Sequence, residues 1–198
     1  MQASAGTYAN GRRCTKVDDL MHVVFYRNLN LGHAGSPNRE QLEGALERGG
    51  ALRVRSFQTN GTVLLEAEAP ERVVAAAASE LGSLAGYDDA AIVRSLADLE
   101  RVLALGVFEK HQSPRTYRET VTFFRGGKEP SWSTPWTNSK DDVDVLHIGD
   151  GIALSLIRKP RNSAGSPTFE LERATGGVAT TRTRGSIDRL LRVAATWK

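Results

Sequence analysis

The chain has 198 residues, enough for one large domain or two small ones with a core that needs no disulfide or metal to hold it together. Its composition, 40% hydrophobic and 25% charged, is that of an ordinary globular protein, and the lack of a long apolar run excludes a membrane-spanning helix. A single cysteine excludes an intrachain disulfide framework, so we expect a cytoplasmic protein.

Residues 1–20 show no apolar periodicity, and we expect a disordered tail that includes Cys14. No apolar segment follows Arg12-Arg13, which argues against a signal peptide, and Met21 is a second possible start of translation. The net charge of +3 arises mainly in residues 107–198, which hold 15 basic and 10 acidic residues. This excess permits an anionic ligand or a nucleic acid but requires neither.

The first half alternates strands and helices. Apolar runs and turn residues predict strands at 21–26, 52–57, 62–66 and 90–94, a helix from Ser36-Pro37 to Gly49-Gly50, and a second helix from Pro70. The order β-α-β-β-α-β predicts a ferredoxin-like antiparallel sheet with both helices on one face. We assign it to residues 21–106, together with a bridging helix that begins at Ser95.

The second half, residues 107–198, predicts another α+β unit. Its elements are strands at 119–124, 142–148, 152–157 and 178–181, a helix at about 167–175, and a final helix with Ile187, Leu190, Leu191 and Ala194 on one face. The loop 126–141 contains Trp132 and Trp136. They could stack on nucleic-acid bases, but tryptophan is buried on average, so we favour anchoring of the loop to the core.

Polar side chains gather where the first two strands end. Arg27, Asn28 and Asn30 follow the first strand, and Gln58 and Asn60 follow the second. A right-handed crossover makes these strands parallel, so both groups should lie at one edge of the sheet. Turn asparagines often serve only their own backbone, whereas the arginine and the glutamine fit that explanation less well and are candidate ligand contacts.

A second polar group precedes the final helix. Thr181 and Arg182 end a predicted strand there, and Arg184 follows. Because free N–H groups and the dipole at a helix start favour an anion, we predict that these residues hold a phosphate or carboxylate, shared with the first group if the two halves face each other. The alternative is that Ser186 only caps the helix and that Arg182 pairs with an acidic neighbour.

Three segments resemble the signature regions of a bacterial family catalogued as domain of unknown function 1697 (DUF1697): residues 27–32, Arg-Asn-Leu-Asn-Leu-Gly; 56–61, Ser-Phe-Gln-Thr-Asn-Gly; and 180–182, Thr-Thr-Arg. The resemblance runs from Met21 nearly to the end of the sequence. Asn28 stands where the family pattern has glycine, and residues 183–185 replace its Asn-Trp-Asn. The resemblance implies a ferredoxin-like first part and an α+β second part, with no established activity.

Several common chemistries are not predicted. The four histidines show no ligand-type pairing, so we expect no metal site. We find no phosphate-binding loop, dinucleotide fingerprint or Gly-x-Ser-x-Gly elbow, and we expect no cofactor. His33, in the first polar loop, is the histidine best placed for acid or base work. The third strand lacks the aromatic residues that stack RNA bases, so a nucleic-acid partner is not expected.

We therefore expect a binding or regulatory module for a small anionic ligand. One alternative is an enzyme on an anionic substrate, with His33 or a carboxylate as base and the arginines as electrostatic clamps. Another is a weak nucleic-acid binder that uses the basic second half. The sequence predicts no oligomeric state.

Overall fold

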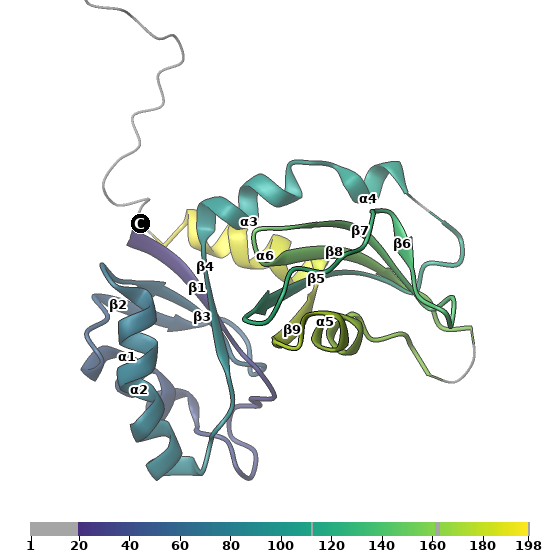
Figure 1. Cartoon of the computed structure of the whole chain (residues 1–198). Helices are drawn as coiled ribbons and strands as arrows, with labels where there is room; N and C mark the ends of the chain where they lie inside the picture. The colour runs from purple at the N-terminus through teal and green to yellow at the C-terminus, as the bar shows by residue number, and fades with distance from the viewer. Residues whose placement is uncertain (1–19, 112, 161–162, 198) are drawn as a thin grey trace, which may run out of the picture.

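The structure, a computed structural model, describes residues 20–111, 113–160 and 163–197. It contains two antiparallel sheets that share a core, with helices packed around them (Figure 1). The predicted tail lies outside the described residues apart from Leu20, and Cys14 lies outside them as well. In these ranges no helix combines the length and the apolar character needed to cross a membrane.

Four strands form the first sheet. They are β1 (Met21–Tyr26), β2 (Arg53–Ser56), β3 (Thr62–Glu66) and β4 (Ala91–Ser95), in the spatial order β2-β3-β1-β4. Since β3 is antiparallel to both β1 and β2, the first two strands run in one direction with β3 between them. Their carboxyl ends meet as predicted, because the N–H of Leu31 donates to the carbonyl of Thr59 at 2.7 Å.

Two helices, α1 (Arg39–Arg48) and α2 (Pro70–Ala85), cover one face of this sheet (Figure 1). The start of α1 is Asn38 rather than the predicted Ser36-Pro37. Asn38 and Gln41 form a capping box in which each side chain accepts the backbone N–H of the other, at 2.9 and 2.8 Å. Ser36 instead accepts the N–H of Asn30 at 3.3 Å and so serves the preceding turn.

Five strands form the second sheet. They are β5 (Arg118–Arg125), β6 (Trp136–Thr137), β7 (Val143–Gly149), β8 (Ile152–Ile157) and β9 (Val178–Thr183), in the order β6-β7-β8-β5-β9. One face packs against α5 (Pro167–Thr175), and the other shares a core with α3 (Leu96–Leu103), α4 (Val107–Lys110) and α6 (Arg184–Ala195). The short β6 and α4 were not predicted, since two and four residues show no measurable period.

The junction between β9 and α6 differs from the prediction. Arg182 lies within the sheet, opposite Val121 of β5, and β9 continues to Thr183, beyond the strand end predicted at residues 181–182. The helix cap is Thr183 rather than Ser186, because the Thr183 hydroxyl accepts the N–H of Ser186 at 3.3 Å. The side chain of Arg182 therefore leaves from a strand and not from a helix start.

One hydrophobic core joins the two sheets. Phe25 of β1 stacks on Phe123 of β5, with ring centroids 3.7 Å apart and ring planes 10° apart. Both side chains are fully buried, and each such burial stabilises the fold by about 1.5–3 kcal/mol. Side chains of α3, α4 and α6 belong to the same buried cluster. The two sheets are thus held face to face by apolar packing.

The tryptophan loop is anchored as the sequence predicts. Trp132 and Trp136 stack with ring centroids 4.0 Å apart. Both are partly buried against the core cluster that includes Val143, Val145 and Leu171. They are therefore packing residues of the second sheet.

Candidate functional site

Arg182 reaches from β9 to the first sheet and is only 8% exposed. Its guanidinium donates to five neutral oxygens at 2.7 to 3.0 Å: Thr62 Oγ1, Thr180 Oγ1 and the carbonyls of Tyr26, Asn60 and Thr181. The sequence-based alternative of an acidic partner is wrong, since none of these acceptors is a carboxylate. Burial lowers the pKa of Arg182 to about 10. With all five N–H groups in use, a ligand would have to displace a bond to the protein.

The other predicted residues beside α6 also have protein partners. Arg184 pairs with Glu119 at 3.1 Å and with Glu109. The hydroxyl of Thr181 lies 2.8 Å from that of Thr122 on β5 and 2.7 Å from that of Thr168 on α5. These contacts join β9 to its neighbours.

Arg27 links β1 to the second half of the chain. Its Nε donates to Glu172 of α5 at 2.9 Å, and Nη1 donates to Asp89 at 2.9 Å. Asn28, in a left-handed conformation with φ of +50°, donates its amide to the same Asp89 at 2.8 Å. The hydrogen bond that Arg27 donates to Glu172, together with the nearby Asp89, holds the pKa of Arg27 above its ordinary value. The charge of Arg27 is thus already neutralised within the protein.

The hairpin side chains face α6, whereas the turn after β1 faces outward. Gln58 accepts the hydroxyl of Ser186 at 2.6 Å and the amide of Asn60 at 3.3 Å. Asn30 and His33 are exposed, and a backbone bond of 3.1 Å closes the turn between them. Of the predicted residues, Gln58 lines a cavity of about 500 Å³ beside α6. Three of the eight predicted side chains, those of Arg27, Gln58 and Arg182, therefore bond across the seam between the halves. The other five bond within one half or are exposed.

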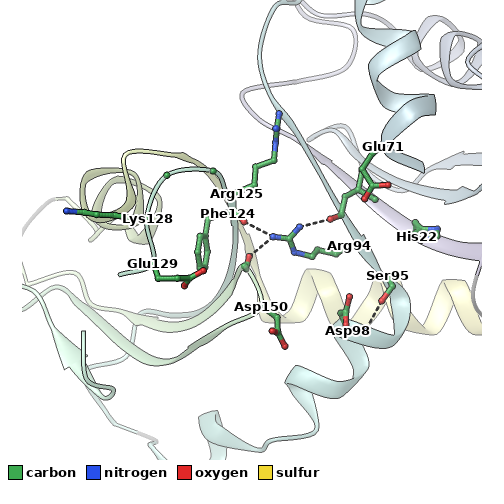
Figure 2. Close-up of a pocket in the computed structure, with 14 residues that line it drawn as sticks. His22, Glu71, Arg94, Ser95, Asp98, Phe124, Arg125, Lys128, Glu129 and Asp150 are labelled. Atoms are coloured by element: carbon green, nitrogen blue, oxygen red, sulfur yellow. Dashed lines mark hydrogen bonds between the residues drawn. The ribbon is translucent and has the colours of Figure 1, made fainter. Parts of the chain in front are cut away.

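A cavity of about 540 Å³ opens elsewhere along this seam, between β4 and the turn that follows β5; we call it the interface cavity (Figure 2). Charged side chains from both halves line it: Glu71, Arg94, Asp98, Arg125, Lys128, Glu129 and Asp150. The turn contains Gly126 and Gly127, with φ of +74° and +71°. A Cβ on Gly127 would lie 2.1 Å from the carbonyl oxygen of Thr175, so only glycine lets this turn pack on α5 beside the cavity.

Arg94 crosses the seam inside this cavity. Its Nη2 donates to the carbonyls of Phe124 and Gly151 at 2.6 and 3.0 Å, and its Nη1 donates to that of Val93 at 2.6 Å (Figure 2). Its Nε is buried and has no partner among the described residues. Burial lowers the pKa of Arg94, although the nearby carboxylates of Asp98 and Glu71 act to raise it. The structure thus holds a partly buried cation whose bonds all go to neutral carbonyls.

The charges around the interface cavity balance. Three basic and four acidic side chains line it. Two of the acidic ones, Asp98 and Asp150, pair with Arg101 at 2.7 and 3.2 Å. With Arg101 counted, four positive and four negative charges surround the cavity. The basic side chains can bind an anionic group, and the remaining carboxylates can accept from a hydrogen-bond donor of the same ligand.

A smaller cavity of about 320 Å³ adjoins the first under α2; we call it the helix cavity. Both cavities include Glu71, Val93, Arg94 and Arg125 in their linings, so they share a wall. No group of three or more His, Cys, Asp or Glu side chains in the described ranges is placed to hold a metal ion.

Comparison with known proteins identifies the family. The family model described as "Protein of unknown function (DUF1697)" matches residues 21–153. The chain belongs to this family. The match includes the DUF1697 segments 27–32 and 56–61, whereas residues 180–182 lie beyond its end. No curated protein matches the sequence.

A solved structure has a similar fold. It is that of a conserved bacterial protein, SP0830 from Streptococcus pneumoniae, which is 13% identical and has a TM-score of 0.54. The similarity covers 87% of this DUF1697 chain and 97% of the other. At this identity the likeness shows a shared fold alone.

Sequence reasoning did not find the interface cavity. It treated Arg94 as the last residue of a strand and residues 126–128 as part of the tryptophan loop. Two adjacent glycines followed by Lys128, directly after a strand, were the available signal, because such a turn lets the backbone approach another element closely.

Proposed function

We propose that this protein binds a small anionic ligand in the interface cavity, through Arg94, Arg125 and Lys128. The observation that carries the proposal is the state of Arg94: a guanidinium at the seam of two sheets, bonded to carbonyls alone, with one buried N–H unused. A partly buried charge that has no carboxylate in hydrogen-bond contact is costly, and a bound anion would offset that cost.

The surroundings of Arg94 support the same conclusion. Arg125 is the last residue of β5, Lys128 follows it on the turn that contains Gly126 and Gly127, and both side chains are exposed at the cavity. Because Arg94 is bonded to Phe124 and Gly151, and Arg125 donates Nε–H to the carbonyl of Ala91 at 3.1 Å, the two sides of the cavity are tied together without a ligand. A preformed site loses less entropy when it binds.

We also assign the first sheet and its two helices to the ferredoxin-like class. The strand order β2-β3-β1-β4, with α1 and α2 packed on one face, supports this assignment. In that arrangement the other face of the sheet is free to pack on a second layer, and here the layer is the second sheet. The interface cavity lies where the two layers part.

The proposal is tested by isothermal titration calorimetry with inorganic phosphate and with acetate, at low ionic strength. We expect binding of at least one of them, and we expect Lys128→Glu to weaken it by about tenfold, the effect of losing one charge-assisted contact. Lys140→Glu is the matched control, because Lys140 is an exposed lysine outside the cavity lining.

Two results would contradict the proposal. One is the absence of any anion binding at millimolar concentration. The other is equal weakening by the two lysine variants, which would mean that the general field of the protein, and not the cavity, attracts the anion.

A further inference from the structure

The helix cavity has an apolar wall built from small residues. Val74, Ala75, Ala78 and Leu81 of α2 form one side, and Ala90, Ala91 and Val93 at β4 form another. Ala75 and Ala78 are three residues apart and therefore lie on the same side of the helix. Their short side chains leave the space that a larger residue would fill. A volume of about 320 Å³ is at the lower end of the range for small-molecule sites.

Tyr26 gives this cavity an unused polar group. The side chain lines the cavity and is 2% exposed, and its hydroxyl has no hydrogen-bond partner among the described residues. Tyr87, its edge-on neighbour at 5.9 Å, behaves differently, since its hydroxyl donates to the carbonyl of Arg27 at 2.6 Å. Buried hydroxyls are normally bonded, so the free hydroxyl of Tyr26 is a second observation that points to a ligand.

The two cavities together define one site with two chemically different parts. Arg94 and Arg125 stand in the wall that the cavities share. A molecule that places its anionic group among the basic residues of the interface cavity can extend past this wall and reach the apolar side of α2 and the hydroxyl of Tyr26.

We infer that the helix cavity is a subsite for a flat apolar group with a hydrogen-bond acceptor for Tyr26, carried by the ligand whose anionic end occupies the interface cavity. The anionic end rests on the proposed function; the apolar subsite rests on Ala75, Ala78 and Tyr26. The ligand class is an aromatic phosphate or carboxylate of small size with a carbonyl-type acceptor.

Calorimetry with matched probes tests this inference. The probes are inorganic phosphate, acetate, 4-acetylphenyl phosphate, 4-acetylbenzoate, and neutral acetophenone, which lacks the anion. On the wild-type protein we expect 4-acetylphenyl phosphate to bind at least about tenfold more tightly than inorganic phosphate, or 4-acetylbenzoate at least about tenfold more tightly than acetate, because a buried ring adds apolar area. The tighter of the two identifies the anionic group.

Three variants test whether the gain in affinity comes from the helix cavity. Ala78→Leu fills the helix cavity and should abolish the tenfold gain while the affinity for inorganic phosphate stays the same. Ala76→Leu is the matched control: it makes the same change on the same helix, at an exposed position that lines a different cavity, and should alter neither affinity. Tyr26→Phe should weaken the acetyl-bearing probe several-fold and leave inorganic phosphate unaffected. Circular dichroism checks that each variant is folded, and Ala75→Leu replaces Ala78→Leu if the latter is not.

The outcomes separate this inference from the proposed function. If phosphate binds but the acetyl-bearing anions bind no more tightly, or if Ala78→Leu leaves the gain intact, the inference is overturned and the proposed function stands. If acetophenone binds in a manner sensitive to Ala78→Leu while no anion binds, the apolar subsite is supported and the proposed function is overturned. If no probe binds, both are overturned.

Discussion

The buried Arg182 offers a quantitative test of how the sheets are joined. Arg182→Met keeps the length of the side chain but removes five hydrogen bonds, which at about 1 kcal/mol each cost about 5 kcal/mol. The same change relieves the burial of a charge. The fall of the Arg182 pKa from 12.5 to about 10 corresponds to about 3 kcal/mol, at 1.36 kcal/mol per pKa unit. The net expected loss of stability is therefore about 2 kcal/mol.

The assay is urea unfolding followed by tryptophan fluorescence, with the free energy of unfolding extrapolated to water. Arg184→Met is the control, because Arg184 forms partly exposed ion pairs and its loss should cost less than about 1 kcal/mol. If the two variants lose the same amount, the five bonds of Arg182 do not stabilise the seam and the reasoning is refuted.

Three further outcomes are expected. Burial raises the pKa of Tyr26 above the ordinary value of 10, so the folded state keeps a proton that the unfolded chain loses and stability falls as pH rises above about 10. Between pH 8 and pH 11 the urea midpoint of unfolding should fall less for Tyr26→Phe than for the wild-type protein. Other groups titrate equally in both proteins, so an equal fall in the two midpoints would rule the explanation out. In thermal unfolding, Gly151→Ala should lower the free energy of unfolding by about 2–3 kcal/mol, because the added Cβ would lie 2.0 Å from Nη2 of Arg94. Gly126→Ala is the control: Gly126 has a similar φ but open space around its Cβ position, so this variant should lose only about 1 kcal/mol. Equal costs would mean that Arg94 moves aside freely. Phe123→Ala should cost about 3–5 kcal/mol by urea unfolding and keep a single transition, and two separate transitions would show that the sheets unfold independently.

The element order was predictable because it depends on local periodicity. The strand at residues 152–157 and the helix at 167–175 have the predicted bounds, since both combine a clear apolar pattern with strong end signals. The predicted start of a helix was wrong where two neighbouring polar residues could each serve as its N-cap. Ser36 and Asn38 are both good caps, and only the capping box with Gln41 decides between them.

The contacts of the candidate site could be predicted only in part. The meeting of the first two strand ends follows from topology, and it brings Gln58 and Asn60 to the seam. Three of the five partners of Arg182 could not be foreseen, because they come from segments more than 100 residues away and two of them are backbone carbonyls, which carry no sequence signal. The interface cavity was missed for the same reason: Arg94 lines it through bonds to the carbonyls of the other sheet.

The shared core sets an order for folding during synthesis. The first sheet can pair its strands once β4 has left the ribosome, but the face that carries Phe25, Leu64 and Ile92 stays bare until β5 and α6 have been made. At the usual rates of translation the remaining hundred or so residues take about 5–20 s. Throughout that interval the nascent chain presents an apolar sheet surface, and we expect chaperones that recognise such surfaces to bind it until the last helix emerges.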